Sequence, residues 1–266
     1  MGVINVTPDS FSDGGRFANS AAAVSHALQM VEDGAGLIDV GGESTRPGAQ
    51  GVSAEEEISR VIPVIEALAA RTKVPISIDT SKPAVMTAAV RAGASMINDV
   101  RALREPGALE AAAGTDAAIC LMHMQGEPRT MQAEPRYGDV VAEVCDFLRE
   151  RAAACLASGI AGDRLVVDPG IGFGKRLEHN LALLAGLPAL TGLGWPVLIG
   201  VSRKSMFGPL LGRAVDERVA GGVAVATAAV LAGASIVRTH DVAATVDAVK
   251  VAVALREAGK AVGCRQ

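Results

Sequence analysis

Residues 168–175, with the sequence D-P-G-I-G-F-G-K, place a carboxylate, a lysine and three glycines directly after an apolar run. That run, residues 165–167, has the length and β-branched content of a short buried strand. Polar residues at the carboxyl ends of strands, followed by flexible loops, are where α/β folds carry their chemistry. A P-loop does not fit, because Pro169 and Arg176 replace the glycine and the Ser or Thr that it needs. A dinucleotide fingerprint fails as well, since Lys175 stands where its third glycine belongs.

Apolar runs of the same kind recur along the whole chain and alternate with helical patterns. We predict eight strands, at residues 3–6, 37–40, 75–78, 95–97, 117–122, 165–167, 197–199 and 235–237. The helices predicted after them span residues 18–33, 53–71, 83–92, 106–113, 139–158, 177–190, 216–232 and 242–257, and residues 203–211 form a short extra helix. Strands that alternate with helices indicate a parallel sheet.

Three segments repeat one pattern, in which a helix ends at a glycine and a short strand follows. The glycines are Gly34, Gly93 and Gly233, and the strands end five residues later in Asp39, Asn98 and Arg238. Glycine in this place caps the helix and lets the chain turn. Equivalent turns bring the polar strand ends to one rim, and eight units with right-handed crossovers fit a (β/α)8 TIM barrel. We therefore predict a single α/β domain over residues 1–266. A doubly wound open sheet is the alternative, but it usually lacks so many equivalent strands.

The composition narrows the kind of partner. Half of the 266 residues are hydrophobic and only 3% are aromatic, so small and branched side chains must fill the core. The net charge of −4 argues against nucleic acid as the main partner. Four cysteines without metal-type spacing indicate reduced thiols in a cytosolic protein. Residues 219–237 carry no charge, but their small side chains predict a buried helix and strand rather than a membrane span.

Polar residues stand at or just after the ends of the predicted strands. They are Asn5, Asp39, Asp79, Asn98, His123, Asp168, Lys204, Arg238 and His240. For any one of them alone we expect a strand-end or helix-capping role, but nine on one rim indicate a site. Asp79, Asn98 and Asp168 offer acceptors and an amide, which suit a flat heterocycle with N–H and NH₂ groups.

A second subset of the rim suits an anion. Arg238 and His240 follow the last strand, which closes on the first strand and so lies beside Asn5. These residues could bind a phosphate or pyrophosphate, with Asn5 on Mg²⁺. Lys204 and Ser205 would begin the short extra helix, whose N–H groups can also hold an anion, although a capped surface turn is as good an interpretation of Ser205.

Other residues that could catalyse a reaction are expected to have structural roles. His123, between Met122 and Met124, is expected to pack rather than to catalyse. No serine or cysteine has a credible His and Asp partner, so a covalent triad is not supported. Lys175 is expected to be structural or to face the solvent.

Seven motifs along the chain resemble, in order, those of the dihydropteroate synthases of bacterial folate synthesis. They are N-V-T-P-D-S-F-S-D-G-G (5–15), I-D-V-G-G-E-S-T-R-P-G (38–48), I-N-D-V (97–100), M-H-M-Q-G (122–126), D-P-G-I-G-F-G-K (168–175), S-R-K-S (202–205) and R-T-H-D (238–241). The resemblance implies a cytoplasmic, homodimeric transferase of (β/α)8 fold. Such an enzyme joins 6-hydroxymethyl-7,8-dihydropterin pyrophosphate to p-aminobenzoate and releases pyrophosphate with Mg²⁺. Members of the family carry a leading stretch before the first strand, whereas this sequence begins within that strand, so we expect a trimmed start or a barrel bottom closed differently.

The resemblance also implies roles for particular residues. The pterin would be bound by Asp79, Asn98, Asp168 and Lys204, with Met122 also in the substrate site. Asn5, Arg238 and His240 would hold the pyrophosphate and the metal, and Phe11, Thr45, Pro47, Phe173 and Ser205 would form the p-aminobenzoate pocket. Asp13 and Arg46, on two loops that complete the site, would be catalytic together with Lys204.

The implied reaction needs no protein nucleophile, which agrees with the missing triad. Pyrophosphate leaves readily once cations neutralise its charge, and the electron-rich pterin stabilises a cation at its methylene. Two alternatives remain at this point. A pterin-binding methyltransferase barrel would keep the pterin acceptors without needing Arg238 and His240. A non-catalytic pterin-binding paralogue would be marked by lost loop residues, and both loops are intact.

Overall fold

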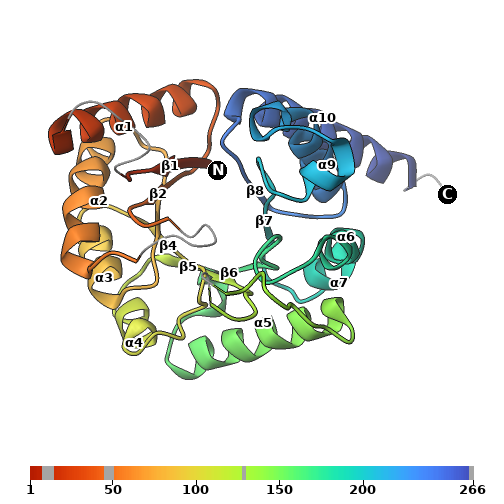
Figure 1. Ribbon diagram of the computed structural model, residues 1–266, viewed down its shortest axis with the longest axis horizontal. Helices are drawn as coiled ribbons and strands as arrows, with labels where there is room; N and C mark the ends of the chain where they lie inside the picture. The colour runs from red at the N-terminus through yellow and green to blue at the C-terminus, as the bar shows by residue number, and fades with distance from the viewer. Residues whose placement is uncertain (8–14, 45–50, 128–129, 264–266) are drawn as a thin grey trace.

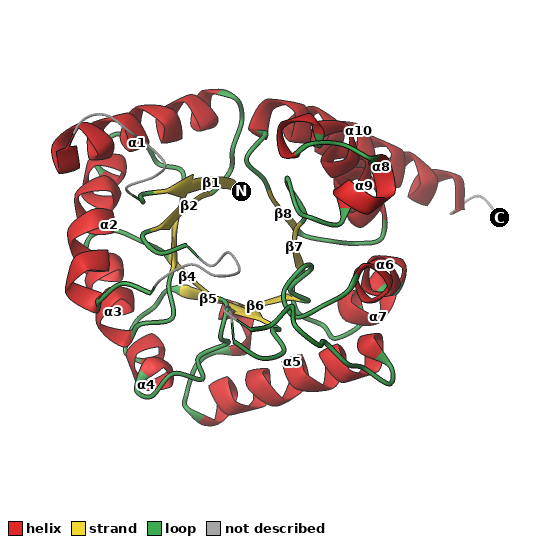
Figure 2. Cartoon of the chain, in the orientation of Figure 1, coloured by secondary structure: helices red, strands yellow, loops and turns green. Residues whose placement is uncertain are grey.

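The computed structural model describes residues 1–7, 15–44, 51–127 and 130–263, and in it eight strands ring a common axis with helices outside them (Figures 1 and 2). The strands are β1 (Gly2–Asn5), β2 (Ile38–Gly41), β3 (Ile76–Asp79), β4 (Met96–Asp99), β5 (Ala118–Met122), β6 (Leu165–Asp168), β7 (Leu198–Gly200) and β8 (Ile236–Arg238). Each lies within one or two residues of its predicted range. The predicted (β/α)8 architecture is confirmed.

The paired strands are all parallel, but they form two separate sheets around the ring. β1 to β6 form one six-stranded sheet in chain order, and β7 pairs with β8 in a second sheet. Single parallel bridges join the two sheets, Val167 to Val197 on one side and Gly2 to Thr239 on the other. At the second seam the Val3 amide donates to the Thr239 carbonyl at 3.1 Å. The ladder is therefore continuous over six strands and reduced to bridges at two seams.

The helices follow the strands, as alternation predicts. Their bounds are α1 (Gly15–Glu32), α2 (Ala54–Ala69), α3 (Pro83–Arg91), α4 (Ala108–Ala113), α5 (Val140–Ala157), α6 (Leu177–Ala185), α7 (Leu187–Thr191), α8 (Phe207–Leu211), α9 (Val219–Leu231) and α10 (Val242–Gly263), with 3₁₀ turns at Gly162–Arg164 and Val215–Glu217. Residues 219–237 thus form α9 and β8, as predicted. Among the described residues, no helix is both long and apolar enough to cross a membrane.

Three predicted helices differ from the structure, one of them only in that α10 continues to Gly263, beyond its predicted end at residue 257. The helix predicted over residues 177–190 is divided at Gly186 into α6 and α7, because Pro188 has no amide hydrogen and its ring would clash with the preceding turn. The extra helix after β7 begins at Phe207 and not at Arg203, so Lys204 and Ser205 lie in the turn before it. Arg203 itself has a φ of 59°, which is incompatible with a helical start.

The repeated glycines have the conformation that the sequence predicted. Gly34, Gly93 and Gly233 have φ angles of 97°, 116° and 100°. After each glycine the next amide donates back to a carbonyl in the last turn of the helix, as Ala94 does to Ala89 at 2.9 Å. The same helix end therefore occurs three times, and each time it aims the following strand toward the same rim.

The core has two layers, which explains how so few aromatic residues suffice. Inside the ring, Met96, Cys120, Val166 and Leu198 pack against one another. Between the strands and the helices lie side chains that are fully buried, among them Ile38, Ile78, Ile97, Ile119 and Leu165. Branched aliphatic side chains on both faces of short parallel strands are typical of barrels. The polar rim stands directly above the inner layer.

Candidate active site

Strand register places the polar strand ends at one level. Asn5 pairs with Gly41, Gly41 with Asp79, and Asp79 with Asn98. Because Gly41 has no side chain, space is left between Asn5 and Asp79; a Cβ built there would lie 3.8 Å from Asn5 Oδ1 and 3.5 Å from Asp79 Cβ. Asn5, which is half-buried, and Asp79 therefore share the mouth of the barrel.

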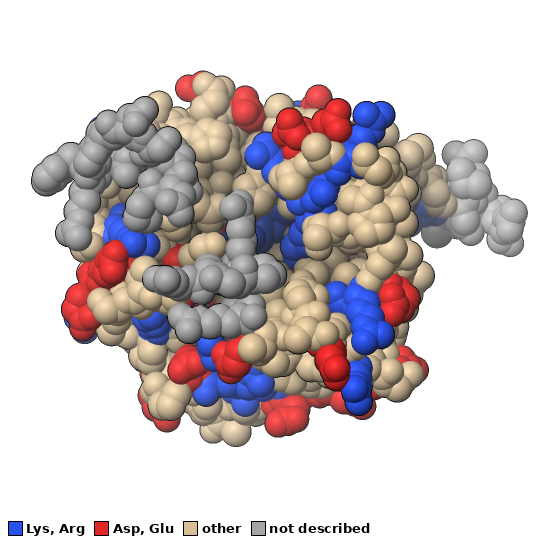
Figure 3. All heavy atoms as spheres, in the orientation of Figure 1, with Lys and Arg blue, Asp and Glu red and all other residues tan. Residues whose placement is uncertain are grey.

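Arg238 on β8 reaches across this mouth to two carboxylates. Its Nε donates to Asp39 Oδ2 at 2.7 Å, and its Nη2 lies 2.8 Å from Asp79 Oδ2. The Asn98 amide donates to the same oxygen of Asp39 at 3.2 Å. Asp39 is fully buried, and its other carboxylate oxygen has no hydrogen-bond partner among the described residues. In the space-filling view, basic side chains reach into the hollow near the middle of this face (Figure 3).

The pKa of Asp79 is affected by the Arg238 guanidinium, which pairs with both Asp79 and Asp39. Burial raises the pKa of Asp79, the Arg238 charge lowers it, and the Asp39 charge raises it again, so that it reaches about 7. Near neutral pH this carboxyl group is therefore partly protonated. A ligand that donates hydrogen bonds to Asp79 would select its ionised form.

Asp168 and Lys204 are two buried groups of opposite charge that influence each other electrostatically. The amide of Gly170 donates to Asp168 Oδ1 at 2.7 Å. Burial raises the pKa of Asp168, and the nearby Lys204 charge opposes that shift. For Lys204, burial lowers the pKa to about 8, against the attraction of Asp168. The Lys204 ammonium also donates to the Ile171 carbonyl and lies 5.0 Å from the centroid of the Phe173 ring.

Lys175 is buried, so the prediction of a solvent-facing side chain was wrong, whereas the structural role is confirmed. It is only 3% exposed, and its Nζ lies 2.9 Å from each of three acceptors: Gly170 O, Phe173 O and His123 Nδ1. His123 packs edge-on against Phe147, with 4.9 Å between ring centroids. This contact agrees with the packing role predicted for His123.

The loops after β7 and β8 are tied to each other. The His240 amide donates to Ser202 Oγ at 3.1 Å, and the same hydroxyl lies 3.3 Å from Asp241 Oδ2. Arg203 forms an ion pair with Asp241 at 2.6 Å. His240 is thereby fixed at the rim beside Arg238.

The anion-binding helix start predicted at Lys204 and Ser205 is not formed. The amides of Lys204 and Phe207 donate to the carbonyls of Val201 and Lys204, at 3.1 and 3.3 Å. Ser205 is exposed in the turn before α8. These two amides are used within the turn and are therefore not available to a ligand.

The structure brings together some of the predicted site residues and leaves others undecided. Those at one rim are Asn5, Asp79, Asn98, Asp168, Lys204, Arg238 and His240. Met122 is buried against Val100, Met124 and Met131, with Phe173 packed on the same cluster. Phe11, Asp13, Thr45, Arg46 and Pro47 lie outside the described residues. Asp39 stood on the predicted rim, but its pairing with Arg238, 199 residues away, had no sequence signal.

The fold and the rim define a class of protein. Residues 1–240 match the family described as pterin binding enzyme, which agrees with the polar acceptors at the ends of β3, β4 and β6. The dihydropteroate synthase of Escherichia coli (strain K12) is 55% identical over 251 residues, which cover 94% of this chain and 89% of that protein.

Solved structures agree with that match. The Yersinia pestis dihydropteroate synthase, in a sulfonamide drug complex, superposes with a TM-score of 0.92 at 53% identity, covering 97% of this chain and 94% of that one. The Xanthomonas albilineans enzyme with 4-aminobenzoic acid gives a TM-score of 0.91 at 56% identity, covering 96% and 92%. The chain belongs to the pterin-binding enzymes and, within them, to the dihydropteroate synthases. The methyltransferase and non-catalytic alternatives gain no support.

Proposed function

We propose that the protein condenses 6-hydroxymethyl-7,8-dihydropterin pyrophosphate with p-aminobenzoate to give 7,8-dihydropteroate and pyrophosphate. The observation that carries this proposal is the single rim on which acceptors from β3, β4 and β6 face the cations Lys204 and Arg238. Membership of the dihydropteroate synthases supplies the reaction, and the rim supplies groups of the right chemistry for it.

The acceptor side of the rim would bind the pterin. Asp79 and Asp168 accept from ring N–H and amino groups, and Asn98 can both donate and accept. All three lie at the mouth of an apolar barrel, where hydrogen bonds to a charged group contribute more than in water. Because Arg238 contacts Asp79 in this structure, the bound pterin would share or displace that contact.

The cationic side would receive the pyrophosphate. Arg238 can form bidentate hydrogen bonds to phosphate oxygens, and His240 stands next to it. No group of three or more His, Cys, Asp or Glu side chains in the described part of the chain could hold a metal. Mg²⁺ typically takes one or two protein oxygens and otherwise phosphates and water, so the Asn5 carboxamide at the rim fits a metal bound chiefly through substrate. The ion would neutralise charge on the leaving group.

Bond cleavage would precede bond formation. The C–O bond at the pterin methylene breaks with its electron pair going to pyrophosphate, and the electron-rich ring stabilises the resulting cation. The lone pair of the p-aminobenzoate nitrogen then forms the new C–N bond, and that nitrogen gives up a proton to the solvent. Phe173, beside Lys204, would wall the p-aminobenzoate pocket, with Ser205 at its edge. The chain then only has to bind, orient and exclude water.

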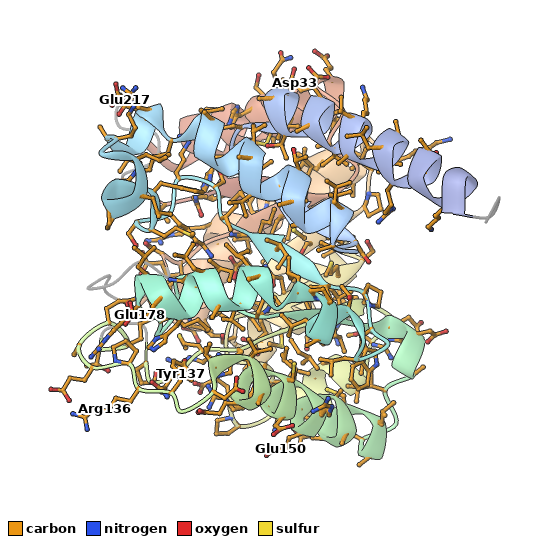
Figure 4. All side chains as sticks on the ribbon, turned by 90° about the vertical axis from the view of Figure 1, so that its right-hand side faces the viewer. Asp33, Arg136, Tyr137, Glu150, Glu178 and Glu217 are labelled. Atoms are coloured by element: carbon orange, nitrogen blue, oxygen red, sulfur yellow. The ribbon has the colours of Figure 1, made fainter. Side chains whose placement is uncertain are left out.

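We also propose a homodimer in the cytosol. Leu231 on α9, with Val251 and Leu255 on α10, are each about half exposed, at 46%, 58% and 56%. Arg256 donates to the carbonyl of Val230, so these residues lie on one part of the surface. Figure 4 shows α9 and α10 side by side on this flank. Cys120, Cys145 and Cys155 are free and buried, which suits a reducing compartment.

A pyrophosphate-release assay tests the activity. The purified protein should release pyrophosphate only when pterin pyrophosphate, p-aminobenzoate and Mg²⁺ are all present, and chelation by EDTA should stop it. No release under the complete conditions would refute the proposal. In calorimetry, Asp168→Asn should weaken pterin binding by about 1.5–3 kcal/mol, because it removes a charged acceptor. Asp163→Asn, an exposed position just before the same strand, is the matched control and should leave binding unchanged.

A further inference from the structure

The loop after β6, residues 169–175 and here called the glycine loop, has a hydrogen-bond donor on each carbonyl from Gly170 to Gly174. Gly170 O and Phe173 O accept from Lys175, and Ile171 O accepts from Lys204. Gly172 O accepts from Gln132, and Gly174 O accepts from the Tyr137 hydroxyl at 2.8 Å. Side chains from outside the loop therefore determine its backbone shape, with one exception: Lys175 belongs to the loop itself.

Close backbone packing explains why the donor must come from Lys175. Gly170 and Gly174 have φ angles of 65° and 60°. A Cβ on Gly170 would overlap the carbonyl oxygen of His123, and one on Gly174 would overlap that of Gln125. The glycine loop thus lies with its backbone directly on the loop after β5. The Lys175 side chain reaches this contact from the end of the loop, with its Nζ 2.9 Å from both Gly170 O and His123 Nδ1.

Lys175 satisfies every donor it has. An ammonium group carries three N–H bonds, and Nζ has three acceptors at 2.9 Å, in Gly170, Phe173 and His123. Burial, aided by the Lys175 charge, lowers the pKa of His123 to about 3, so the imidazole is neutral and its Nδ1 can accept. Burial also lowers the pKa of Lys175, to about 7, because the ammonium exchanges water for these three contacts.

The contacts of Lys175 enclose the turn that carries Phe173. The Phe173 amide donates to Gly170 O at 3.0 Å, and the carbonyls at the two ends of that turn, Gly170 O and Phe173 O, accept from the same ammonium. Within the turn, Ile171 O accepts from Lys204, whose Nζ lies 5.0 Å from the Phe173 ring centroid. The Lys175 ammonium thereby fixes the backbone before and after Phe173. This stretch includes Ile171, whose carbonyl accepts from Lys204.

We propose that Lys175, seated on His123, is a positioning residue that holds Phe173 and Lys204 in the geometry for capturing p-aminobenzoate. This inference rests on the proposed function, in which Phe173 walls the pocket of the second substrate. Lys175 acts through the loop and touches neither substrate. Of the proposed pterin acceptors, Asp79 and Asn98 lie on other strands, whereas Asp168 precedes the glycine loop and is influenced by the Lys175 charge less than by Lys204.

The test is steady-state kinetics of Lys175→Met with each substrate varied in turn. Methionine fills the volume but leaves Phe173 O and the His123 nitrogen without the ammonium donor, and Gly170 O keeps only the Phe173 amide. The KM for p-aminobenzoate should rise about tenfold, the effect of losing one charge-assisted hydrogen bond. The KM for pterin pyrophosphate should rise by a clearly smaller factor, because among its acceptors only Asp168 is influenced by the Lys175 charge. Tyr137→Phe is the matched control, because it removes a hydrogen bond to Gly174 O, beyond the Phe173 turn, and both KM values should stay near those of the parent protein.

Two more variants separate the possible failures. Phe173→Ala should raise the KM for p-aminobenzoate; if it does not, the assignment of the pocket and the inference both fall. If Phe173→Ala raises it but Lys175→Met does not, or if Lys175→Met raises both KM values equally, the positioning role alone is overturned. Should Lys175→Met not fold, His123→Leu removes one of the three acceptors and should give the same selective rise, smaller in size.

Discussion

Asp79 and Arg238 form an ion pair at the centre of the mouth, and a pterin that uses Asp79 as an acceptor must compete with the guanidinium. The competition is limited because Arg238 also pairs with Asp39, which is fully buried and holds it from below. Arg238 can therefore release Asp79 and still keep Asp39 as a counterion. At the scale of single residues, the pairing with Asp39 makes Arg238 available to a pyrophosphate.

The raised pKa of Asp79 has a measurable consequence. Below pH 7 the ligand-free carboxyl group is mostly protonated, since its pKa is about 7. A pterin that donates to the carboxylate must first displace that proton, so its affinity should fall by about tenfold per pH unit below 7 and level off above it. Calorimetry between pH 5.5 and 8.5, in buffers of different ionisation enthalpy, should show proton release on binding.

Asp79→Asn provides the control for this titration. The amide cannot ionise, so the pH dependence and the buffer-dependent proton release should both disappear, although binding itself weakens. A pH profile that Asp79→Asn leaves intact would assign the titration to the ligand or to another residue. Asp168, whose pKa burial also raises, is the group on the protein to examine next.

At the scale of elements, three helix ends of one conformation set where the strands begin. Gly93, between α3 and β4, has a φ of 116°, and a Cβ built on it would lie 2.8 Å from the Cβ of Ala69. The sequence repeat predicted such a turn, and the structure adds the contact with the neighbouring helix. Since Asn98 follows five residues later, this turn also sets the height of a rim residue.

Gly93→Ala should destabilise the protein by about 1–3 kcal/mol, because alanine is strained at positive φ and meets Ala69. Urea unfolding followed by circular dichroism would measure the change. Gly36→Ala is the matched control: Gly36 lies in the corresponding connection before β2, is outside the positive-φ glycines, and a Cβ there has no neighbour within 4 Å. Equal stability of the two variants would show that the turn tolerates a side chain.

At the scale of the whole molecule, one flank of the barrel differs from the rest. α9 and α10 pack against each other on one flank of the molecule (Figure 4). Leu231 on α9 and Val251 and Leu255 on α10 are about half exposed. The strands surround the barrel axis, whereas α9 and α10 lie on the outside of the ring (Figure 1). A second copy could cover this flank and leave the mouth of the barrel open.

The double substitution Val251→Glu and Leu255→Glu should convert the dimer to a monomer. Charges on the buried centre of an interface are strongly unfavourable. Sedimentation velocity of the parent protein should give a dimer, and the variant should sediment as a monomer with its circular dichroism unchanged. Leu156→Glu, at a residue 47% exposed on α5, is the control that should stay dimeric. A parent protein that is monomeric at micromolar concentration would exclude the proposed dimer.

The sequence determined the eight strand–helix units, the glycine turns and the identities of the rim residues. These features depend on local periodicity and on backbone preferences, which neighbouring residues specify. Helix boundaries at Gly186 and Phe207 were predicted less well, because a proline and a residue at positive φ break a pattern that the side chains alone would continue. Because α8 begins at Phe207, Ser205 lies in the turn before the helix and not in its first turn.

Only the tertiary structure decided which side chains meet. Asp39 and Arg238 are 199 residues apart, and their contact exists because β8 closes on β1. The same holds for Lys175. Its sequence position is compatible with binding a phosphate, with facing the solvent or with making hydrogen bonds inside the protein. Parallel pairing of β5 with β6 places His123, 52 residues away, against it and so selects the buried role. The pKa values of these groups depend on burial and on neighbouring charges. Both arise from contacts between distant parts of the chain, which local sequence does not specify.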